Sequence, residues 1–411
     1  MRAIKTLAVV WALLVVLVLA GRQAEAAVMV QCPVKAGGAV LGDLNHDGLI
    51  RADSGEITNP VSAKEVCKSI TGGDGFALMA DGTETYVFGF SDVTGLAADS
   101  IMSAGMLGAN APAPTIALKE GDEFYLTLTN VGMVMRPDLF DPHSVHWHGF
   151  PNASAVFDGI PEDSATINQG SSITYYYKVV VPGTYIYHCH VEAAEHIQMG
   201  MVGSLYVHPA QDGQSKTFLG RTYTKFAYND GDGSTGYDKE FAILLDSFDY
   251  KFHLADLSIQ PLAFAEMRDD YALINGRGYP DTANPGALAP PPSNGGKVVQ
   301  PVGSLLQAKK GERVLLRLAN LNVTRFYTLT ALGIPMQVVG FNARVLRGPG
   351  GQNLYYKTTS VTTGGGESVD VLLDTANVVP GTYFLYTTNL NYLSNGPEDF
   401  GGMMTELVVT P

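Results

Sequence analysis

Six of the nine histidines in this 411-residue chain lie between residues 143 and 196, far more than an even spread would place there. They form two short groups, His143-Ser144-Val145-His146-Trp147-His148 and His188-Cys189-His190, and the second group is followed by His196 and Met201. Imidazole, thiolate and thioether are ligands that proteins use for copper and zinc. The spacing therefore predicts a metal site, because ordinary hydrogen-bonded histidines would not account for so many candidate ligands.

Each group contains an H-x-H pattern in or beside a predicted strand. Because side chains on a strand alternate between its two faces, His188 and His190 share one face and Cys189 points to the other. His146 and His148 share a face for the same reason. The pattern predicts two neighbouring metal sites that are joined through the backbone.

A blue-copper site needs two imidazoles, one thiolate and a weak axial thioether. Cys189, His196 and Met201 supply three of these ligands, and His143 can supply the fourth. Met199 is an alternative thioether. Zinc is the competing metal, but a zinc site requires neither a trailing methionine nor a thiolate flanked by histidines that face away from it. We therefore predict copper.

Short strands bounded by turn residues must position these ligands. Their alternation and spacing predict an antiparallel sandwich or barrel. Because such strands recur in both halves, we predict an all-β chain of two tandem β-sandwich domains of the Greek-key type. The predicted strands are residues 85–90, 115–119, 123–129, 172–181, 184–188 and 203–208 in the first half, and 241–248, 313–318, 326–331, 336–339, 368–373 and 382–388 in the second. Residues 287–302, rich in proline, form a predicted surface loop. The polar segment 211–222 is the predicted domain junction.

The predicted domain boundaries follow from composition. Residues 1–26 read as a secretory signal, because Arg2 and Lys5 precede an apolar run that ends before an Ala24-Glu25-Ala26 cleavage site. The alternative, a membrane anchor, requires a longer apolar run, so we predict an exported protein, periplasmic or extracellular, without a membrane span. A Gly- and Asp-rich extension (27–80), a copper-binding domain (81–212) and a second domain without copper ligands (213–411) follow.

The charge and the remaining motifs set further limits. A formal net charge of −14 disfavours nucleic acid and anionic lipid as partners and promotes solubility. In an oxidising compartment, pairing of Cys32 with Cys67 would leave Cys189 as a lone thiol, which metal ligation would explain and protect. Asp43, Asn45 and Asp47 match the start of a calcium loop and predict bound calcium, although Ser54 stands where that loop ends in Glu. Asp53 and Glu56 are candidate substitutes for this Glu, and an Asx-rich turn without calcium is the alternative.

The first half resembles a cupredoxin domain of the multicopper oxidases in the residues and the order of its motifs. These motifs are Pro112-Ala113-Pro114-Thr115-Ile116, Lys119-Glu120-Gly121-Asp122, His146-Trp147-His148-Gly149, Asp158-Gly159-Ile160-Pro161 and Gly183-Thr184-Tyr185-Ile186-Tyr187-His188-Cys189-His190. The second half is similar in Leu273-Ile274-Asn275-Gly276-Arg277 and in residues 311–320. Where a copper-binding domain would carry H-C-H, the second half has Thr387-Thr388-Asn389, and its only histidine is His253.

The resemblance implies a role for each candidate ligand. The type-1 copper ligands would be His143, Cys189, His196 and Met201, the type-2 ligand His146, and the type-3 ligands His148, His188 and His190. Asp158 falls where such enzymes keep a carboxylate that delivers protons beside the trinuclear cluster, although an ordinary Asp-Gly turn is the alternative. The family's complete cluster uses eight imidazoles and one chain supplies four, so we hypothesise a homo-oligomer in which two copper domains face each other.

The activity that the resemblance implies is oxidation of a donor, either a small electron-donating substrate or a redox protein, coupled to reduction of dioxygen. One alternative is a copper nitrite reductase-like enzyme. Its His-x-x-Asp-x-His pattern has His146 here in place of the Asp, and His190 is an added ligand, so both changes favour oxygen chemistry. A second alternative is a non-enzymatic blue-copper electron carrier, which would leave the four clustered histidines without a role.

Overall fold

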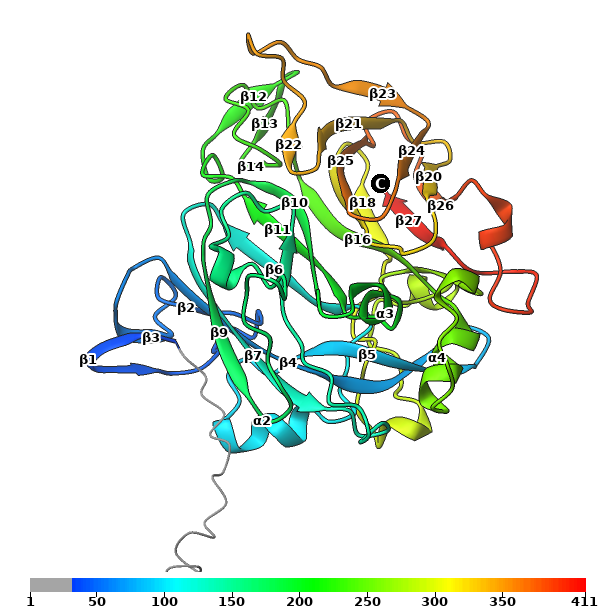
Figure 1. Cartoon of the computed structure of the whole chain (residues 1–411). Coiled ribbons are helices and arrows are strands. Elements are labelled where there is room, and N and C mark those ends of the chain that lie inside the picture. The colour runs from blue at the N-terminus through cyan, green and yellow to red at the C-terminus, as the bar shows by residue number, and fades with distance from the viewer. Residues whose placement is uncertain (1–31) are drawn as a thin grey trace, which may run out of the picture.

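The computed structural model describes residues 32–411, so the predicted signal segment, residues 1–26, lies outside the described part of the chain. Strands are the main elements, and every segment that the sequence predicts as a strand overlaps one in the structure. The all-β prediction is therefore confirmed. Figure 1 shows the strands in two groups, the first in blue to green and the second mostly in yellow to red.

The first half folds as two sheets. One has the order β2 (Ile50–Arg51), β4 (Glu65–Leu78), β7 (Glu123–Gly132) and β9 (Ser172–Lys178), with β5 (Glu84–Asp92) also paired to β4. The other has the order β6 (Ala113–Lys119), β11 (Val202–His208), β10 (Gly183–His188) and β8 (His146–His148). The helices are α2 (Ala98–Gly105), α3 (Ala193–Gln198) and the 3-10 turn η1 (Ala155–Phe157). Phe124 and Trp147, one from each sheet, lie in a single apolar core with ring centroids 5.6 Å apart, so the sheets form a sandwich.

The second half repeats this arrangement. Its larger sheet has the order β17 (Tyr271–Ile274), β16 (Lys239–Phe248), β19 (Arg313–Asn320), β25 (Glu367–Asp374), β21 (Met336–Phe341) and β22 (Arg344–Val345), with β23 (Tyr356–Thr358) on β21. The facing sheet has the order β18 (Leu306–Lys309), β27 (Met404–Thr410), β26 (Gly381–Thr387), β20 (Tyr327–Ala331) and β24 (Ser360–Thr363). The helical elements are α4 (Tyr250–Leu257), η2 (Phe264–Glu266), η3 (Asp281–Ala283), η4 (Pro292–Asn294) and η5 (Leu390–Tyr392). A second apolar core lies between these sheets.

Pairing in both halves is mixed, not purely antiparallel as the sequence led us to expect. β4 pairs with β7, and β6 with β11, in parallel. β16 pairs with β19, and β18 with β27, in the same way. Long crossing connections bring these strands together in the same direction, which a tight hairpin cannot do.

β4 lies in the segment, residues 27–80, that was expected to precede the copper-binding domain. It pairs with β7 and β5 near the middle of the first sheet, and nearly all of its residues are buried. Its Gly72-Gly73-Asp74-Gly75 sequence has no β-branched or aromatic side chain, which is why composition assigned it to a Gly- and Asp-rich extension. We therefore propose that the domain begins at or before Glu65.

An exposed hairpin and a disulfide precede β4. The hairpin pairs β1 (Val34–Val40) with β3 (Ile57–Pro60), and Figure 1 shows it projecting from the left of the molecule. Cys32 and Cys67 form a disulfide that ties the start of the hairpin to β4. Among the described residues Cys189 is the free cysteine, and it is buried.

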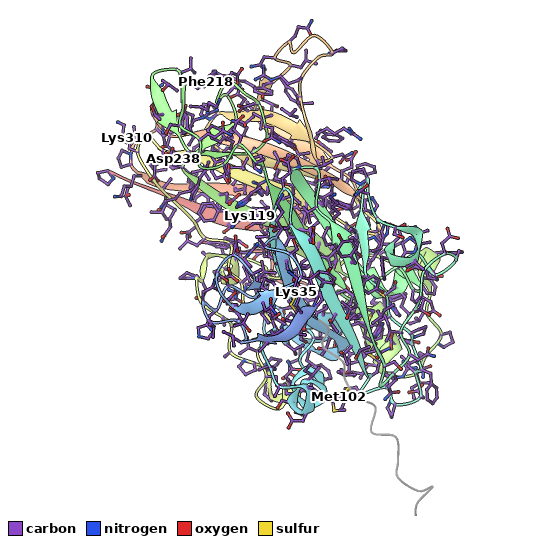
Figure 2. The ribbon with its side chains drawn as sticks, turned by 90° about the vertical axis from the view of Figure 1, so that its left-hand side faces the viewer. Lys35, Met102, Lys119, Phe218, Asp238 and Lys310 are labelled. Atoms are coloured by element: carbon purple, nitrogen blue, oxygen red, sulfur yellow. A yellow bond between two sulfur atoms is a disulfide. The ribbon has the colours of Figure 1, made fainter. Side chains whose placement is uncertain are left out.

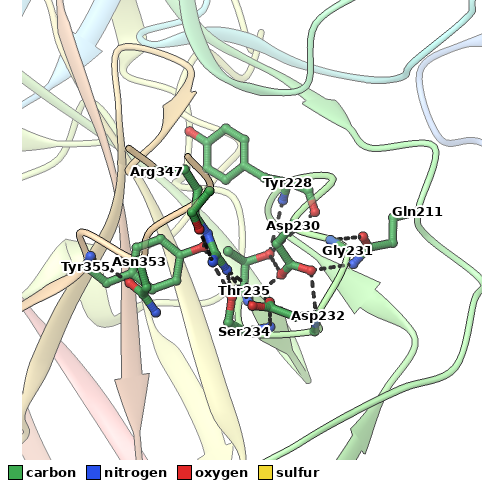
Figure 3. Close-up of polar contacts among 12 residues, drawn as sticks. Gln211, Tyr228, Asp230, Gly231, Asp232, Ser234, Thr235, Arg347, Asn353 and Tyr355 are labelled. Carbon is green, nitrogen blue, oxygen red and sulfur yellow. Dashed lines mark hydrogen bonds and ion pairs between the residues drawn. The ribbon is translucent and has the colours of Figure 1, made fainter. Parts of the chain in front are cut away.

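The expected junction is packed against the second half. It contains the hairpin β12 (Lys216–Phe218) and β13 (Arg221–Tyr223), followed by the pair β14 (Lys225–Phe226) and β15 (Gly236–Tyr237). Figure 3 shows the polar contacts that hold the neighbouring loop. Gln211 Nε2 donates to Asp230 Oδ1 (2.8 Å), and Arg347 Nη2 donates to Asp232 Oδ2 (2.8 Å) and Ser234 Oγ (2.6 Å).

Buried charges join the two halves. Arg317 on β19 lies 2.6 Å from Glu240 and 3.7 Å from Asp370. Thr184, on the strand that carries His188, donates to Asp370 Oδ1 (2.6 Å). Figure 2 shows the resulting arrangement, with Lys35 and Met102 in one lobe and Phe218, Asp238 and Lys310 in the other. No helix in residues 32–411 is long and apolar enough to cross a membrane.

Candidate metal centre

Strands β8 and β10 lie side by side and bring the two histidine groups together. In their antiparallel register His146 lies opposite His188. Trp147 points into the apolar core, where its ring stacks on Tyr177 with centroids 3.9 Å apart. Because neighbouring side chains on a strand face opposite ways, His146 and His148 point together out of that core.

The four histidines of the two H-x-H patterns form one cluster. The ring centroid of His146 lies 5.2 Å from that of His188, 5.2 Å from that of His190 and 5.9 Å from that of His148. One possible ligand nitrogen from each of His146, His148 and His188 lies within 4.8 Å of the others. The structure therefore brings together the residues that the H-x-H patterns single out.

Backbone carbonyls fix the orientation of two of these rings. His146 Nδ1 lies 2.7 Å from the carbonyl oxygen of Asp158, and His188 Nδ1 lies 2.8 Å from that of Cys189. A carbonyl only accepts, so Nδ1 carries the proton in each ring and the Nε2 lone pair is free. His188 Nε2 is buried without a hydrogen-bond partner. An orphaned lone pair that faces other imidazoles fits a metal ion.

Burial favours the neutral form of three imidazoles of the cluster, those of His146, His148 and His188. It lowers the pKa of His188 to about 3, and the neighbouring histidines add to the effect. Burial also lowers the pKa of His146 and of His148. Neutral imidazole is the form that binds a metal, so protons compete weakly with a metal for these three rings near neutral pH.

Asp158 lies at the edge of the cluster. One of its carboxylate oxygens is 3.5 Å from His146 Nδ1, and its side chain is 26% exposed. The following residue, Gly159, has a φ of +79°, and a Cβ there would lie 2.1 Å from the Val145 carbonyl oxygen. The chain thus requires glycine at position 159 to make this turn, and the same turn places the Asp158 carboxylate beside His146.

A second donor set lies in the core of the first half. Cys189 Sγ is 3.2 Å from His196 Nδ1 and 4.0 Å from His143 Nδ1. The backbone of Met201 holds this set together, because its N–H donates to the His196 carbonyl (2.8 Å) and its carbonyl accepts from the Cys189 N–H (3.1 Å). Met199, the alternative thioether, is also fully buried.

Electrostatics at this set favour a thiolate. Burial alone would raise the pKa of Cys189, but His196 and His143 outweigh it and hold the pKa well below its usual value. Burial alone would lower the pKa of His196, but Cys189 and Asp141 raise it to about 10. The metal-free set is therefore a thiolate–imidazolium pair, which fits a cation that replaces the proton on His196.

Two residues at this set were not anticipated from the sequence. A Cβ on Gly72 of β4 would lie 2.7 Å from the His143 ring and 3.4 Å from Met201 Cε, so this glycine makes room for the donors. Asp141 Oδ2 lies 3.7 Å from His196 Nε2. The position of Asp141, two residues before His143, is a local signal that could have been noticed. Gly72 gives no such signal.

The second half contacts the histidine cluster without adding a ligand. A Cβ on Gly366 would lie 2.7 Å from His148 Nε2. His253, the only histidine of this half, is buried elsewhere with its Nδ1 2.5 Å from the Tyr86 carbonyl oxygen. The described part of the second half therefore adds no imidazole to the four of the cluster.

The Asp43 loop is held by its own side chains. Asp43 carboxylate oxygens accept from the N–H groups of Asp47 (3.1 Å) and Gly48 (3.0 Å), and Asn45 Oδ1 accepts from the Asp47 N–H (2.9 Å). Glu56, a considered substitute ligand, accepts from the Leu44 N–H (2.9 Å). These are the bonds of an Asx-rich turn, and calcium binding there stays a prediction.

Two tandem sandwiches, one with a buried Cys-His-His set beside a histidine cluster, define a protein of two cupredoxin-type domains. Residues 97–212 match the family model for multicopper oxidases. The solved blue copper oxidase from Nitrosomonas europaea has the same fold, with a TM-score of 0.61, 22% identity, and coverage of 84% of this chain and 85% of that one.

Two sequence relatives agree with this class. L-ascorbate oxidase of Nicotiana tabacum is 27% identical over 325 residues, which are 72% of this chain and 49% of the relative. Copper-containing nitrite reductase of Neisseria meningitidis serogroup A is 25% identical over 284 residues, or 67% of this chain and 57% of the relative. The chain spans about half the length of these relatives. In these comparisons the chain is similar to multicopper oxidases, and the family model itself matches residues 97–212.

Proposed function

We propose that the chain is a copper-dependent oxidoreductase of the multicopper oxidase type, which takes single electrons from a donor and delivers them to dioxygen. The observation that carries this proposal is the H-C-H segment. Cys189 belongs to the buried thiolate set, whereas His188 and His190 on either side belong to the histidine cluster. When bound, copper would supply one-electron redox chemistry at the first set and dioxygen reduction at the second.

The proposed ligand roles follow the family pattern residue by residue. The type-1 site would be held by His143, Cys189, His196 and Met201; the type-2 copper by His146; and the type-3 pair by His148, His188 and His190. The short Cys189 Sγ to His196 Nδ1 distance of 3.2 Å and the orphaned His188 Nε2 support these roles. The backbone between Cys189 and its two neighbours is the proposed path for electrons.

Asp158 is the proposed proton donor. Reduction of dioxygen to water consumes protons as well as electrons, and a carboxyl group in contact with both solvent and the cluster can deliver them. The Asp158 carboxylate lies 3.5 Å from His146 Nδ1 and is partly exposed. Its role is therefore to hold a proton at the edge of the cluster and to be reprotonated from water.

We propose that a second copy of the chain completes the cluster. One chain supplies four imidazoles, and two copper domains that face each other in a homo-oligomer would supply eight. The test is copper quantitation together with electron paramagnetic resonance on the loaded oligomer. We expect more than one copper per chain and a coupled binuclear pair. About one copper per chain without a coupled pair would contradict shared cluster formation.

The test of the oxidase itself is oxygen uptake with a phenolic or metal-ion donor. A second candidate, nitrite reduction, is favoured by the similarity to copper-containing nitrite reductases over 67% of the chain. The same preparation should therefore be assayed with nitrite as acceptor. A blue, copper-loaded protein that consumes neither acceptor would support the electron-carrier alternative.

The remaining proposals concern location and calcium. The Cys32–Cys67 disulfide supports an exported protein, periplasmic or extracellular, because such bonds persist in oxidising compartments. Fractionation of producing cells would test this. Calcium at Asp43, Asn45 and Asp47 is supported only by the spacing of their oxygens, and calorimetric titration of the chain with calcium would test it.

A further inference from the structure

A cavity of about 240 Å³ lies between the two halves of the chain, beside His148. The second half contributes Asn342, Arg344 and Gly366 to its wall. Figure 1 shows β22, which begins at Arg344, next to the copper-domain strand β10. Pockets for drug-sized ligands usually enclose roughly 300–1,000 Å³, so this cavity suits a ligand of a few non-hydrogen atoms.

Arg344 directly follows the two-residue hairpin turn between β21 and β22, in which Phe341 lies opposite Arg344. Asn342 and Ala343 are consecutive non-glycine residues in the left-handed region, with φ values of 47° and 54°. Two-residue hairpin turns favour this region at both positions, and Asn is a common residue there, so the turn fixes where Arg344 lies. Asn342 donates its N–H to the Ser368 carbonyl (2.8 Å) and accepts from the Ser368 N–H at Oδ1 (2.9 Å).

Ala343 anchors the same turn in the first half. It is buried in the apolar core of that half, although it belongs to the second. Gly183 makes room for it, because a Cβ there would lie 2.6 Å from Ala343 Cα. Arg344 is therefore presented from a turn fixed on both sides of the cleft.

Arg344 has no ion pair within residues 32–411, whereas Arg317 and Arg347 nearby in the fold pair with Glu240 (2.6 Å) and Asp232 (2.8 Å). No residue in the cavity wall carries a carboxylate. Asp370, which lies behind the wall, is already bonded to the hydroxyls of Thr184 and Tyr228. Arg344 is exposed and lies at a cavity without carboxylates, so its charge is available to an anion.

Glycine keeps the His148 side of the cavity open. Gly366 has a φ of +88°, and a Cβ there would lie 2.7 Å from His148 Nε2. Any other residue would cover this edge of the imidazole or displace it. A small ligand in the cavity can therefore reach the guanidinium and the imidazole edge at once.

We propose that this cavity binds a small carboxylate anion, which pairs with the Arg344 guanidinium and with the Asn342 amide. The guanidinium fork matches the two oxygens of a carboxylate, and a charge-assisted bond of this kind is stronger than a neutral one. The Asn342 Oδ1 is occupied by the Ser368 N–H, which leaves its Nδ2 as the donor. The site requires neither copper nor oxidase activity.

The test is titration of the metal-free chain with ¹³C-formate, followed by the line width of the formate signal. We expect saturable binding whose Kd rises at least tenfold in Arg344→Gln, with Arg344→Lys in between because lysine keeps the charge but not the fork. Arg268→Gln is the matched control, because Arg268 is also exposed but lies at a different cavity. Its Kd should equal that of the unaltered chain.

Three results would overturn the proposal: no saturable binding, unchanged binding in Arg344→Gln, or an equal loss in Arg268→Gln. A second arm uses the copper-loaded chain and its paramagnetic resonance spectrum. If formate perturbs the spectrum equally with and without Arg344, the anion sits on the metal alone and the proposal fails. Arg344-dependent binding to a chain that takes up no oxygen would support the anion site while contradicting the oxidase proposal.

Discussion

Cys189 combines two chemical environments in one residue. Its sulfur lies in a fully buried set with His143 and His196, while its carbonyl accepts from Nδ1 of His188 in the histidine cluster. Cys189 would thus bind one metal through its sulfur and also fix, through its carbonyl, the tautomer of His188, a proposed ligand of the neighbouring metal. A change at Cys189 would disturb both donor sets, so single substitutions elsewhere separate them better.

His148→Ala separates the two sets. It removes one member of the histidine cluster and leaves the Cys189 set intact, so we expect the blue colour to remain. Outer-shell changes alone reduce metal-site activity by about 10–100-fold, so loss of a ligand should reduce oxygen uptake at least that much. An oxygen electrode and visible absorption measure the two effects. The control is His46→Asn at an exposed, left-handed position, and loss of colour in His148→Ala would contradict the separation.

Gly72→Ala tests the space around the thiolate set. The added Cβ would lie 2.7 Å from the His143 ring, so we expect a shifted blue absorption band and a loss of stability of ~1–3 kcal/mol from overpacking. Absorption spectra and urea unfolding measure both. Gly381→Ala is the control, because a Cβ there meets nothing within 4 Å. Equal behaviour of the two variants would show that Gly72 is not needed for space.

At the scale of elements, the sequence predicted the strands and the faces of their side chains, because both follow from period-two alternation. Strands β8 and β10, and the shared faces of their histidines, follow from local pattern. β4 could not be predicted from local pattern, because its glycines make room for residues that are distant in sequence. Gly72, for example, lies against His143, 71 positions later. The positions of Gly366 and Arg344 near His148 could not be predicted for the same reason, because only the packing of the two halves brings these residues together. Local propensity cannot report such long-range contacts.

β16 carries a buried carboxyl group that makes stability depend on pH. Burial raises the pKa of Asp246 to about 8, and nearby Asp269 adds to the effect. The unfolded chain releases this proton near the ordinary value of 3.8, so between pH 4 and 8 the folded chain binds more protons and stability falls as pH rises. Removing the ionisable group should remove this loss.

We therefore expect Asp246→Asn to raise the free energy of unfolding of the metal-free chain at pH 8 by on the order of 2–5 kcal/mol. The gain should shrink towards zero near pH 4. Urea unfolding at several pH values measures it. Asp163→Asn, at an exposed position, is the control and should show no pH-dependent gain. A gain that is constant across pH would show that ionisation is not the cause.

At the scale of the whole molecule, Arg317 holds the halves together. It is fully buried and neutralises Glu240 and Asp370, and Asp370 in turn is bonded to Thr184 of the first half. Arg317→Met would leave the buried Asp370 carboxylate without a cation and Glu240 with His208 alone, and breaking a buried pair in this way typically costs about 3–5 kcal/mol. We expect Trp147 fluorescence, which reports the first half, to show a lower midpoint in urea although the change lies in the second.

Arg268→Met, an exposed arginine, is the control for this substitution. If only far-ultraviolet circular dichroism moved and Trp147 fluorescence did not, the halves would be energetically independent and the proposed coupling wrong. Coincident shifts in both signals would show one cooperative unit.

The complete burial of His143, Cys189 and His196 has a kinetic consequence. No ion can reach these donors in the closed fold, so metal uptake must wait for a fluctuation that opens the surrounding chain. At high copper concentration the observed rate of uptake should then level off at the opening rate. The same barrier would slow escape, so a loaded chain would keep its copper long after free copper has been removed.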